Sequence, residues 1–144
     1  MSRVFVTGLG FITSIGNDEA TVVDHLRHLK HGMELFSPLQ IPESPVKLAA
    51  PVKEFDVESY DPEDWTYPQQ YKLRREALRS FSPHVLYAYC SMKQAVETAG
   101  MEEADISNSD TGLYSASAGS SRFLYKSLEK MYRRGVMRCN PLNI

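Results

Sequence analysis

A short apolar segment followed by glycines opens the chain. Residues 4–6 (Val-Phe-Val) are β-branched or aromatic, and they are followed at once by Thr7-Gly8-Leu9-Gly10. A run of this length and composition favours a buried strand over a helix. Because glycine permits positive φ angles and close backbone approaches, the next residues favour a tight turn. The opening therefore predicts a strand, a turn and then a helix.

Apolar residues at helical spacing predict the first helix. Asn17 is placed to cap it, and Gly32 is expected to end it. Its apolar positions are Ala20, Val23, Leu26 and Leu29.

Three histidines, His25, His28 and His31, follow one another at three-residue intervals along this helix. A metal-binding pair favours i, i+4 spacing, and no carboxylate or cysteine completes a ligand set here. We therefore interpret them as solvated or helix-end histidines and expect no metal.

Residues 36–80 read as an irregular excursion, because prolines at 38, 42, 45, 51, 62 and 68 interrupt any long helix. The acidic stretch 56–64 is interpreted as a solvated face. Trp65 and Tyr67 are expected to anchor the excursion by burying aromatic surface.

The helix with the clearest start and stop signals is predicted over residues 82–99. Ser82 suits the cap, Pro83 the first helical position and Gly100 the left-handed end. Burial of the stripe Val85, Tyr89, Met92 and Val96 would contribute about 6–12 kcal/mol before entropy is subtracted. Cys90 lies mid-helix with no neighbouring base, so we interpret it as a packing residue.

A second strand is predicted over residues 112–118, and a helix after it carries Phe123, Leu124, Leu128, Met131 and Tyr132 until Gly135 stops it. The formal net charge of −2 gives no general attraction to nucleic acid. No apolar run suits a membrane span, and the two cysteines lack CxxC spacing. We expect a soluble cytoplasmic protein with reduced thiols.

The glycine turn admits a dinucleotide-binding interpretation, which a third glycine and a later acidic residue would support. The third position falls on Thr13, and prolines stand where a second strand would end in an acid. We therefore disfavour a nucleotide cofactor and expect none.

Three ordered stretches instead resemble the β-ketoacyl-(acyl carrier protein) synthases. Residues 2–17 resemble the opening strand, TGLG turn, serine and glycine of that family. Residues 81–100 resemble its helix that begins F-S and closes A-x-x-x-A-G, and residues 111–122 resemble the strand and small-residue loop that follow.

The resemblance implies the N-terminal part of a thiolase-like layered α/β/α/β/α fold, so we expect strands 4–6 and 113–117 to share a sheet. It implies a decarboxylative Claisen condensation of acyl and malonyl thioesters in fatty acid or polyketide biosynthesis. The family's catalytic cysteine and histidines lie beyond Ile144, so the chain is expected to be an inactive part of a longer protein. Cys139 lacks the elbow that marks the family's nucleophile.

The same resemblance implies two groups of site residues. An acyl carrier protein would dock on basic residues, and the acyl chain would lie near a small-residue loop and the segment after Asn140-Pro141. The carrier-binding residues are Lys72, Arg74, Arg75, Arg79 and Arg138; the acyl-chain residues are Ala116, Ser117, Ala118, Gly119, Leu142, Asn143 and Ile144. The loop is one residue shorter than the usual glycine-rich form.

Several alternatives remain open at this point. The basic run before residue 82 also fits a solvated, helix-leading charge run, and the loop at 116–119 also fits a cap for the next helix. The whole protein would be a homodimer, or a non-condensing, chain-length-factor-like subunit of a heterodimer. A nucleotide-binding module is the further alternative. Since two strands cannot cover both long helices, we expect a marginal or partner-dependent fold for this chain alone.

Overall fold

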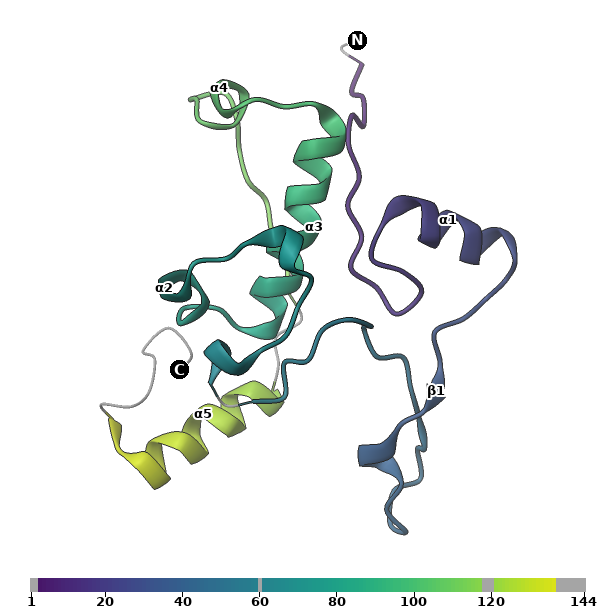
Figure 1. Cartoon of the computed structure of the whole chain (residues 1–144), viewed down its shortest axis with the longest axis vertical. Helices are drawn as coiled ribbons and strands as arrows, with labels where there is room; N and C mark the ends of the chain where they lie inside the picture. Colours follow the sequence, from purple (N-terminus) through teal and green to yellow (C-terminus); the bar gives the residue numbers. More distant parts are fainter. Residues whose placement is uncertain (1–2, 60, 118–120, 137–144) are drawn as a thin grey trace. The chain divides into compact units, whose positions relative to one another are not determined.

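The computed structural model describes residues 3–59, 61–117 and 121–136. The chain divides into two compact units, one made of residues 1–53 and 90–100 and the other of residues 54–89 and 101–144. Helix α3 (Pro83–Ala99) contributes residues to both (Figure 1).

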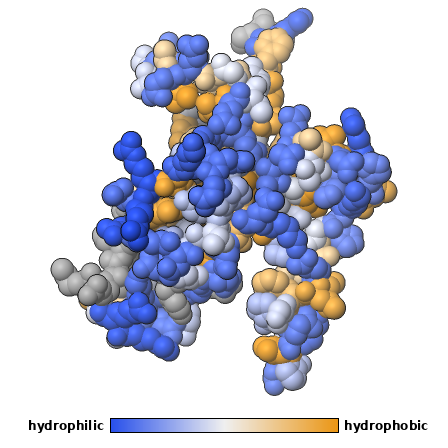
Figure 2. Space-filling view, in the orientation of Figure 1, coloured by the Kyte–Doolittle hydropathy of each residue, from blue (hydrophilic) through white to orange (hydrophobic). Residues whose placement is uncertain are grey.

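The first unit contains helix α1 (Glu19–Arg27) and a small antiparallel sheet with a 3-10 turn, η1 (Ser37–Leu39), between its strands. Strands β1 (Glu34–Leu35) and β2 (Leu48–Ala49) pair with Glu34 opposite Ala49. Figure 2 shows apolar side chains gathered on this hairpin, where Leu35 and Leu48 are at least half exposed.

Both expected ends of the first helix are wrong by a few residues. Asp18, not Asn17, caps α1, because its Oδ1 accepts from the Thr21 amide at 2.8 Å. The helix ends at Arg27, and Leu29 takes the left-handed φ of 52° that glycine was expected to supply at position 32. The Lys30 amide then donates to the His25 carbonyl at 2.9 Å, which satisfies a terminal carbonyl of the helix.

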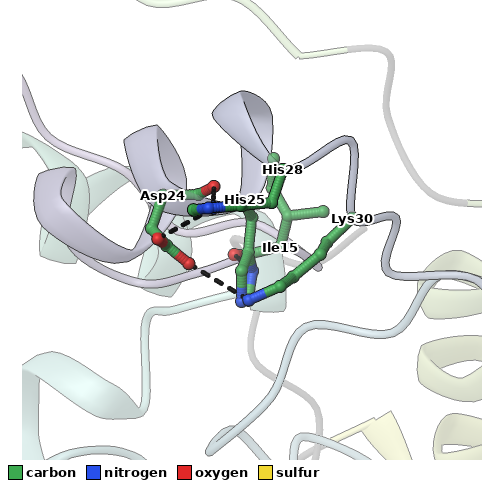
Figure 3. A network of polar contacts seen from close by, with 5 residues as sticks. All are labelled: Ile15, Asp24, His25, His28 and Lys30. Atoms are coloured by element: carbon green, nitrogen blue, oxygen red, sulfur yellow. Dashed lines mark hydrogen bonds and ion pairs between the residues drawn. The ribbon is translucent and has the colours of Figure 1, made fainter.

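Two of the three histidines, His25 in α1 and His28 at its C-cap, make polar contacts with neighbouring residues (Figure 3). His25 Nδ1 lies 2.5 Å from the Ile15 carbonyl oxygen, so this nitrogen is the donor. His28 Nδ1 lies 3.0 Å from one Asp24 carboxylate oxygen, and Lys30 Nζ lies 3.1 Å from the other. Among the residues that the structure describes, no three His, Cys, Asp or Glu side chains gather as a metal site.

Side chains of α3 hold the glycine segment in place. Gln94 Oε1 accepts from the Phe11 amide at 2.9 Å, and Gln94 Nε2 donates to the Asn17 carbonyl at 2.7 Å. Thr98 Oγ1 lies 3.1 Å from both the amide nitrogen and the carbonyl oxygen of Leu9. One face of the helix therefore fixes residues 9–17 through backbone groups (Figure 1).

The two expected core strands are wrong in this structure. Residues 4–6 and 113–117 belong to no strand, so they share no sheet. Val4 is 95% exposed and Tyr114 is 97% exposed, which a central strand would not allow. A strand needs backbone partners, and the described residues provide none for residues 4–6.

The second unit is built from short elements and one longer helix. Besides part of α3, its elements in chain order are η2 (Pro62–Asp64), η3 (Gln69–Tyr71), α2 (Arg75–Leu78), α4 (Glu103–Ile106) and α5 (Ser121–Arg134). Its buried residues among those described are Pro62, Trp65, Tyr71, Leu78 and Leu86. Trp65 also donates from Nε1 to the Ser59 carbonyl at 3.0 Å, which confirms it as an anchor of the excursion; Tyr67 is half-buried.

The bounds of α3 confirm the helix predicted over residues 82–99, but the prediction of which of its side chains are buried is wrong. Gly100 adopts a φ of 66° as the left-handed end, and the Ser82 hydroxyl faces the Val85 amide at 3.4 Å. Val85 and Met92 are 44% and 40% exposed, whereas Leu86 and Cys90 are fully buried. The predicted stripe therefore lies to one side of the face that is packed.

Gly10 is predicted to be irreplaceable because of its contact with α3. A Cβ there would stand 1.8 Å from the Ser91 carbonyl oxygen, a distance that backbone atoms cannot accommodate without moving. We expect Gly10→Ala to raise thermolysin cleavage within residues 5–12 about tenfold, corresponding to an overpacking cost of about 1–3 kcal/mol. Gly112→Ala is the control, since its Cβ would meet only the exposed Tyr114 ring, at 3.3 Å. Equal cleavage of the two variants would contradict the packing.

Cys90 is predicted to be unreactive in the folded chain. Burial raises the pKa of its thiol to about 11, an effect that Lys93 only partly offsets. In a Cys139→Ser variant, we expect iodoacetamide to modify Cys90 at least tenfold more slowly in buffer than in 6 M urea at pH 8. The native rate should rise with pH up to about 11. A native rate equal to the denatured rate would show that Cys90 is not packed.

Candidate functional site

Four basic residues gather around the short helix α2. Lys72 ends η3 with a left-handed φ of 42°, and Arg74 is the N-cap residue of α2. Arg75 is the first residue of that helix and Arg79 is its C-cap. All four are exposed, and Figure 2 shows strongly hydrophilic atoms over α2. We call Lys72, Arg74, Arg75 and Arg79 the α2 basic cluster.

One recessed carboxylate organises half of this cluster. Glu63, from η2, has a side chain only 15% exposed and pairs with two arginines. Its Oε1 accepts from Arg79 Nε at 2.7 Å, and its Oε2 contacts Arg75 Nη2. The guanidinium-bearing side chains themselves remain 75% and 68% exposed for Arg75 and Arg79. Glu63 thus binds two arginines from behind while leaving them accessible.

The electrostatics of these groups reinforce one another. The hydrogen bond from Arg79, followed by the charges of Arg75 and Arg79, lowers the pKa of Glu63 below its ordinary value, although burial opposes this. The hydrogen bond and charge of Glu63 raise the pKa of Arg79 in turn, with smaller contributions from Glu76 and Asp61. Glu63 is therefore a carboxylate at neutral pH.

Lys72 and Arg74 differ from the two arginines bound by Glu63. Within residues 3–59, 61–117 and 121–136, no carboxylate lies within ion-pair distance of either side chain. A cation without a partner among these residues remains available to an incoming anion, and the side chains of Arg75 and Arg79 stay mostly exposed although Glu63 binds both. The cluster can therefore receive carboxylate or phosphate groups.

Glu63 was missed by the sequence interpretation, which treated residues 56–64 as one solvated acidic face. Twelve and sixteen residues separate it from Arg75 and Arg79, so no local spacing rule relates them. Only the return of the chain between η2 and α2 brings them together. The acidic stretch is thus partly a structural support for the basic cluster.

The structure does not test the grouping of the expected acyl-chain residues. Ala116 and Ser117 lie exposed in an irregular segment before α5. Ala118, Gly119, Leu142, Asn143 and Ile144 lie outside the described residues, as do Arg138 and Cys139. Their grouping stays a prediction.

The glycine segment is arranged for contact with a helix. A Cβ at Gly8 would stand 2.1 Å from the Ala95 carbonyl oxygen, and the amides of Leu9 and Phe11 already donate to α3 side chains. A phosphate cradle would need such amides pointing at the ligand. No described helix is long and apolar enough to cross a lipid bilayer.

Comparison with known proteins agrees with the resemblance. The chain matches the family Beta-ketoacyl synthase, N-terminal domain, over residues 1–143. It is 32% identical over 113 residues to 3-oxoacyl-[acyl-carrier-protein] synthase 1 of Haemophilus influenzae, covering 78% of this chain and 25% of that protein. The enzyme of the same name from Escherichia coli K12 is 30% identical over 122 residues, covering 84% of this chain and 27% of that protein.

A plant relative extends the match over almost the whole chain. The chloroplastic 3-oxoacyl-[acyl-carrier-protein] synthase II of Arabidopsis thaliana is 27% identical over 143 residues, which is 96% of this chain and 24% of that protein. The chain thus spans about a quarter of the length of these curated relatives. The resemblance found in the sequence is confirmed, and the chain belongs to the β-ketoacyl synthase family.

Proposed function

We propose that these 144 residues are the N-terminal part of a 3-oxoacyl-[acyl-carrier-protein] synthase. The observation that carries this proposal is the family match over residues 1–143, supported by relatives that bear this name. The whole protein would be an acyltransferase that joins acyl and malonyl thioesters with loss of carbon dioxide. The pathway would be fatty acid or polyketide biosynthesis.

The chemistry would depend on residues outside this chain. A condensation of this kind needs a cysteine thiolate to carry the acyl group and donors to stabilise the enolate and the oxyanion. The 144 residues would contribute framework and partner-binding surface, so we propose that they are inactive alone. The exposed apolar residues Val4, Phe5 and Val6 support a thiolase-like core completed by further polypeptide.

An acyl carrier protein is the proposed partner of the α2 basic cluster. The named relatives are synthases of 3-oxoacyl-[acyl-carrier-protein], and the resemblance implies that this carrier is acidic. Exposed cations would steer an anionic protein and orient it on the surface. Arg138 would extend the cluster, while residues 116–119 and 142–144 would border the acyl chain. A cytoplasmic homodimer completes the proposal.

Two other functions are separated by simple measurements. A non-condensing, chain-length-factor-like subunit would carry glutamine or another residue where the synthases carry the nucleophilic cysteine, which sequencing of the gene beyond the Ile144 codon would reveal. A nucleotide-binding module would show a thermal shift with NAD, NADP or ATP. The packing of Gly8 and Gly10 against α3 favours neither nucleotide nor phosphate at that turn.

We expect the chain to bind acyl carrier protein through Lys72 and Arg74 in a salt-dependent manner. The double variant Lys72→Ala/Arg74→Ala removes two exposed charges and should weaken binding about three- to thirtyfold at 50 mM salt, with a smaller difference at 500 mM. Titration calorimetry measures the affinity. Lys30→Ala/Lys53→Ala, which removes two exposed cations outside the cluster, is the control. Equal binding by both double variants would refute the assignment.

A further inference from the structure

Glu63 stands out because its position is poorly explained as a simple surface charge. It lies in a nine-residue stretch with four other carboxylates, Asp56, Glu58, Asp61 and Asp64, yet only its side chain is shown bridging two arginines of α2. Its carboxylate is recessed, whereas the paired arginines are exposed. An acid in this position can either compete with an anionic partner or hold the arginines ready for it.

The geometry favours the second role. A guanidinium presents its donors in a planar fork, and the side chains of Arg75 and Arg79 remain 75% and 68% exposed while the recessed carboxylate binds both. Arg79 uses Nε toward Glu63, on the inner edge of its guanidinium, and Arg75 uses Nη2. Two flexible side chains four residues apart are thereby fixed by the two oxygens of one carboxylate. The conformational entropy of the two arginine side chains is therefore already lost before the partner binds, so that binding costs less.

We propose that Glu63 is a positioning residue that holds Arg75 and Arg79 as one preorganised receptor for the carboxylates or phosphate of an acidic carrier protein. This inference rests on the proposed function, since it concerns how the α2 basic cluster receives its partner. Glu63 does not touch the partner in this account. It acts only through the two arginines.

Glu76 supplies a matched comparison. It lies on α2, is exposed, and is close enough to influence Arg79 electrostatically without forming a described ion pair. Glu63→Ala and Glu76→Ala raise the net charge equally, so both increase general attraction to an acidic protein. Only the first removes the carboxylate that orders the arginines.

The test is the affinity of the full chain for purified holo-acyl carrier protein at low salt. We expect Glu63→Ala to bind about three- to tenfold more weakly than Glu76→Ala, from the ordering cost of two long side chains. In a background of Arg75→Ala/Arg79→Ala, the two glutamate variants should bind alike. A role for Glu63 in folding alone would leave the difference unchanged in that background. Equal or tighter binding by Glu63→Ala in the native background would overturn the proposal.

Two further measurements keep the result interpretable. Far-ultraviolet circular dichroism compares the helix content of every variant, and if Glu63→Ala loses helix, the isosteric pair Glu63→Gln and Glu76→Gln decides in its place. Failure of the unsubstituted chain to bind the carrier, while circular dichroism shows its helices to be formed, would refute the proposed function and this inference together. Binding that does not depend on Glu63 would refute this inference alone.

Discussion

The contact between the glycine segment and one face of α3 is the constraint on which the first unit depends. The side chains of Gln94 and Thr98 form hydrogen bonds with the backbone of Leu9, Phe11 and Asn17. The carbonyl groups of Ser91 and Ala95 leave no room for a side chain at Gly10 and Gly8, respectively. A polar helix face usually looks toward water. Here its side chains take the place of a neighbouring strand, so the segment is held without a sheet.

This constraint explains why the glycines suggest two different functions when read in isolation. A nucleotide site and a helix-packing site both need residues without a Cβ, because both bring a second group close to the backbone. The structure assigns the space beside Gly8 and Gly10 to α3. The chemistry of the chain therefore has to be sought elsewhere, and the charged surface around α2 is the strongest feature that remains.

Local signals in the sequence were sufficient for the long helices but not for the strands. Ser82, Pro83, Gly100 and Gly135 act on their own neighbours, so the ends of α3 and α5 could be read directly. Strand formation at residues 4–6 requires another segment to complete the backbone hydrogen bonds, which periodicity does not specify. The prediction of which α3 side chains are buried was wrong for a related reason. Burial of Leu86 and Cys90 depends on the segments that pack against the helix, which the hydropathy of the helix itself does not specify.

The α2 basic cluster shows the same contrast between local signals and contacts made by the fold. The cations of the α2 basic cluster lie close together in the sequence, so the sequence alone indicates the cluster. The pairing of Glu63 with Arg75 and Arg79 depends on the fold, which brings η2 next to α2. The proposal that these charges bind an acyl carrier protein draws on the family match and on the carrier named in the relatives' names. The roles of residues 116–119, Arg138 and residues 142–144 stay predictions from the resemblance.

Hydrogen exchange at the Leu9 and Phe11 amides tests the central packing claim most directly. If α3 side chains hold the glycine segment, these two amides exchange more slowly than those of Phe5 and Val6, for which the described residues provide no hydrogen-bond acceptor. Gln94→Ala/Thr98→Val should then remove the protection while α3 stays helical. Equal exchange at all four amides in the unsubstituted chain, or protection that survives the double substitution, would contradict the account.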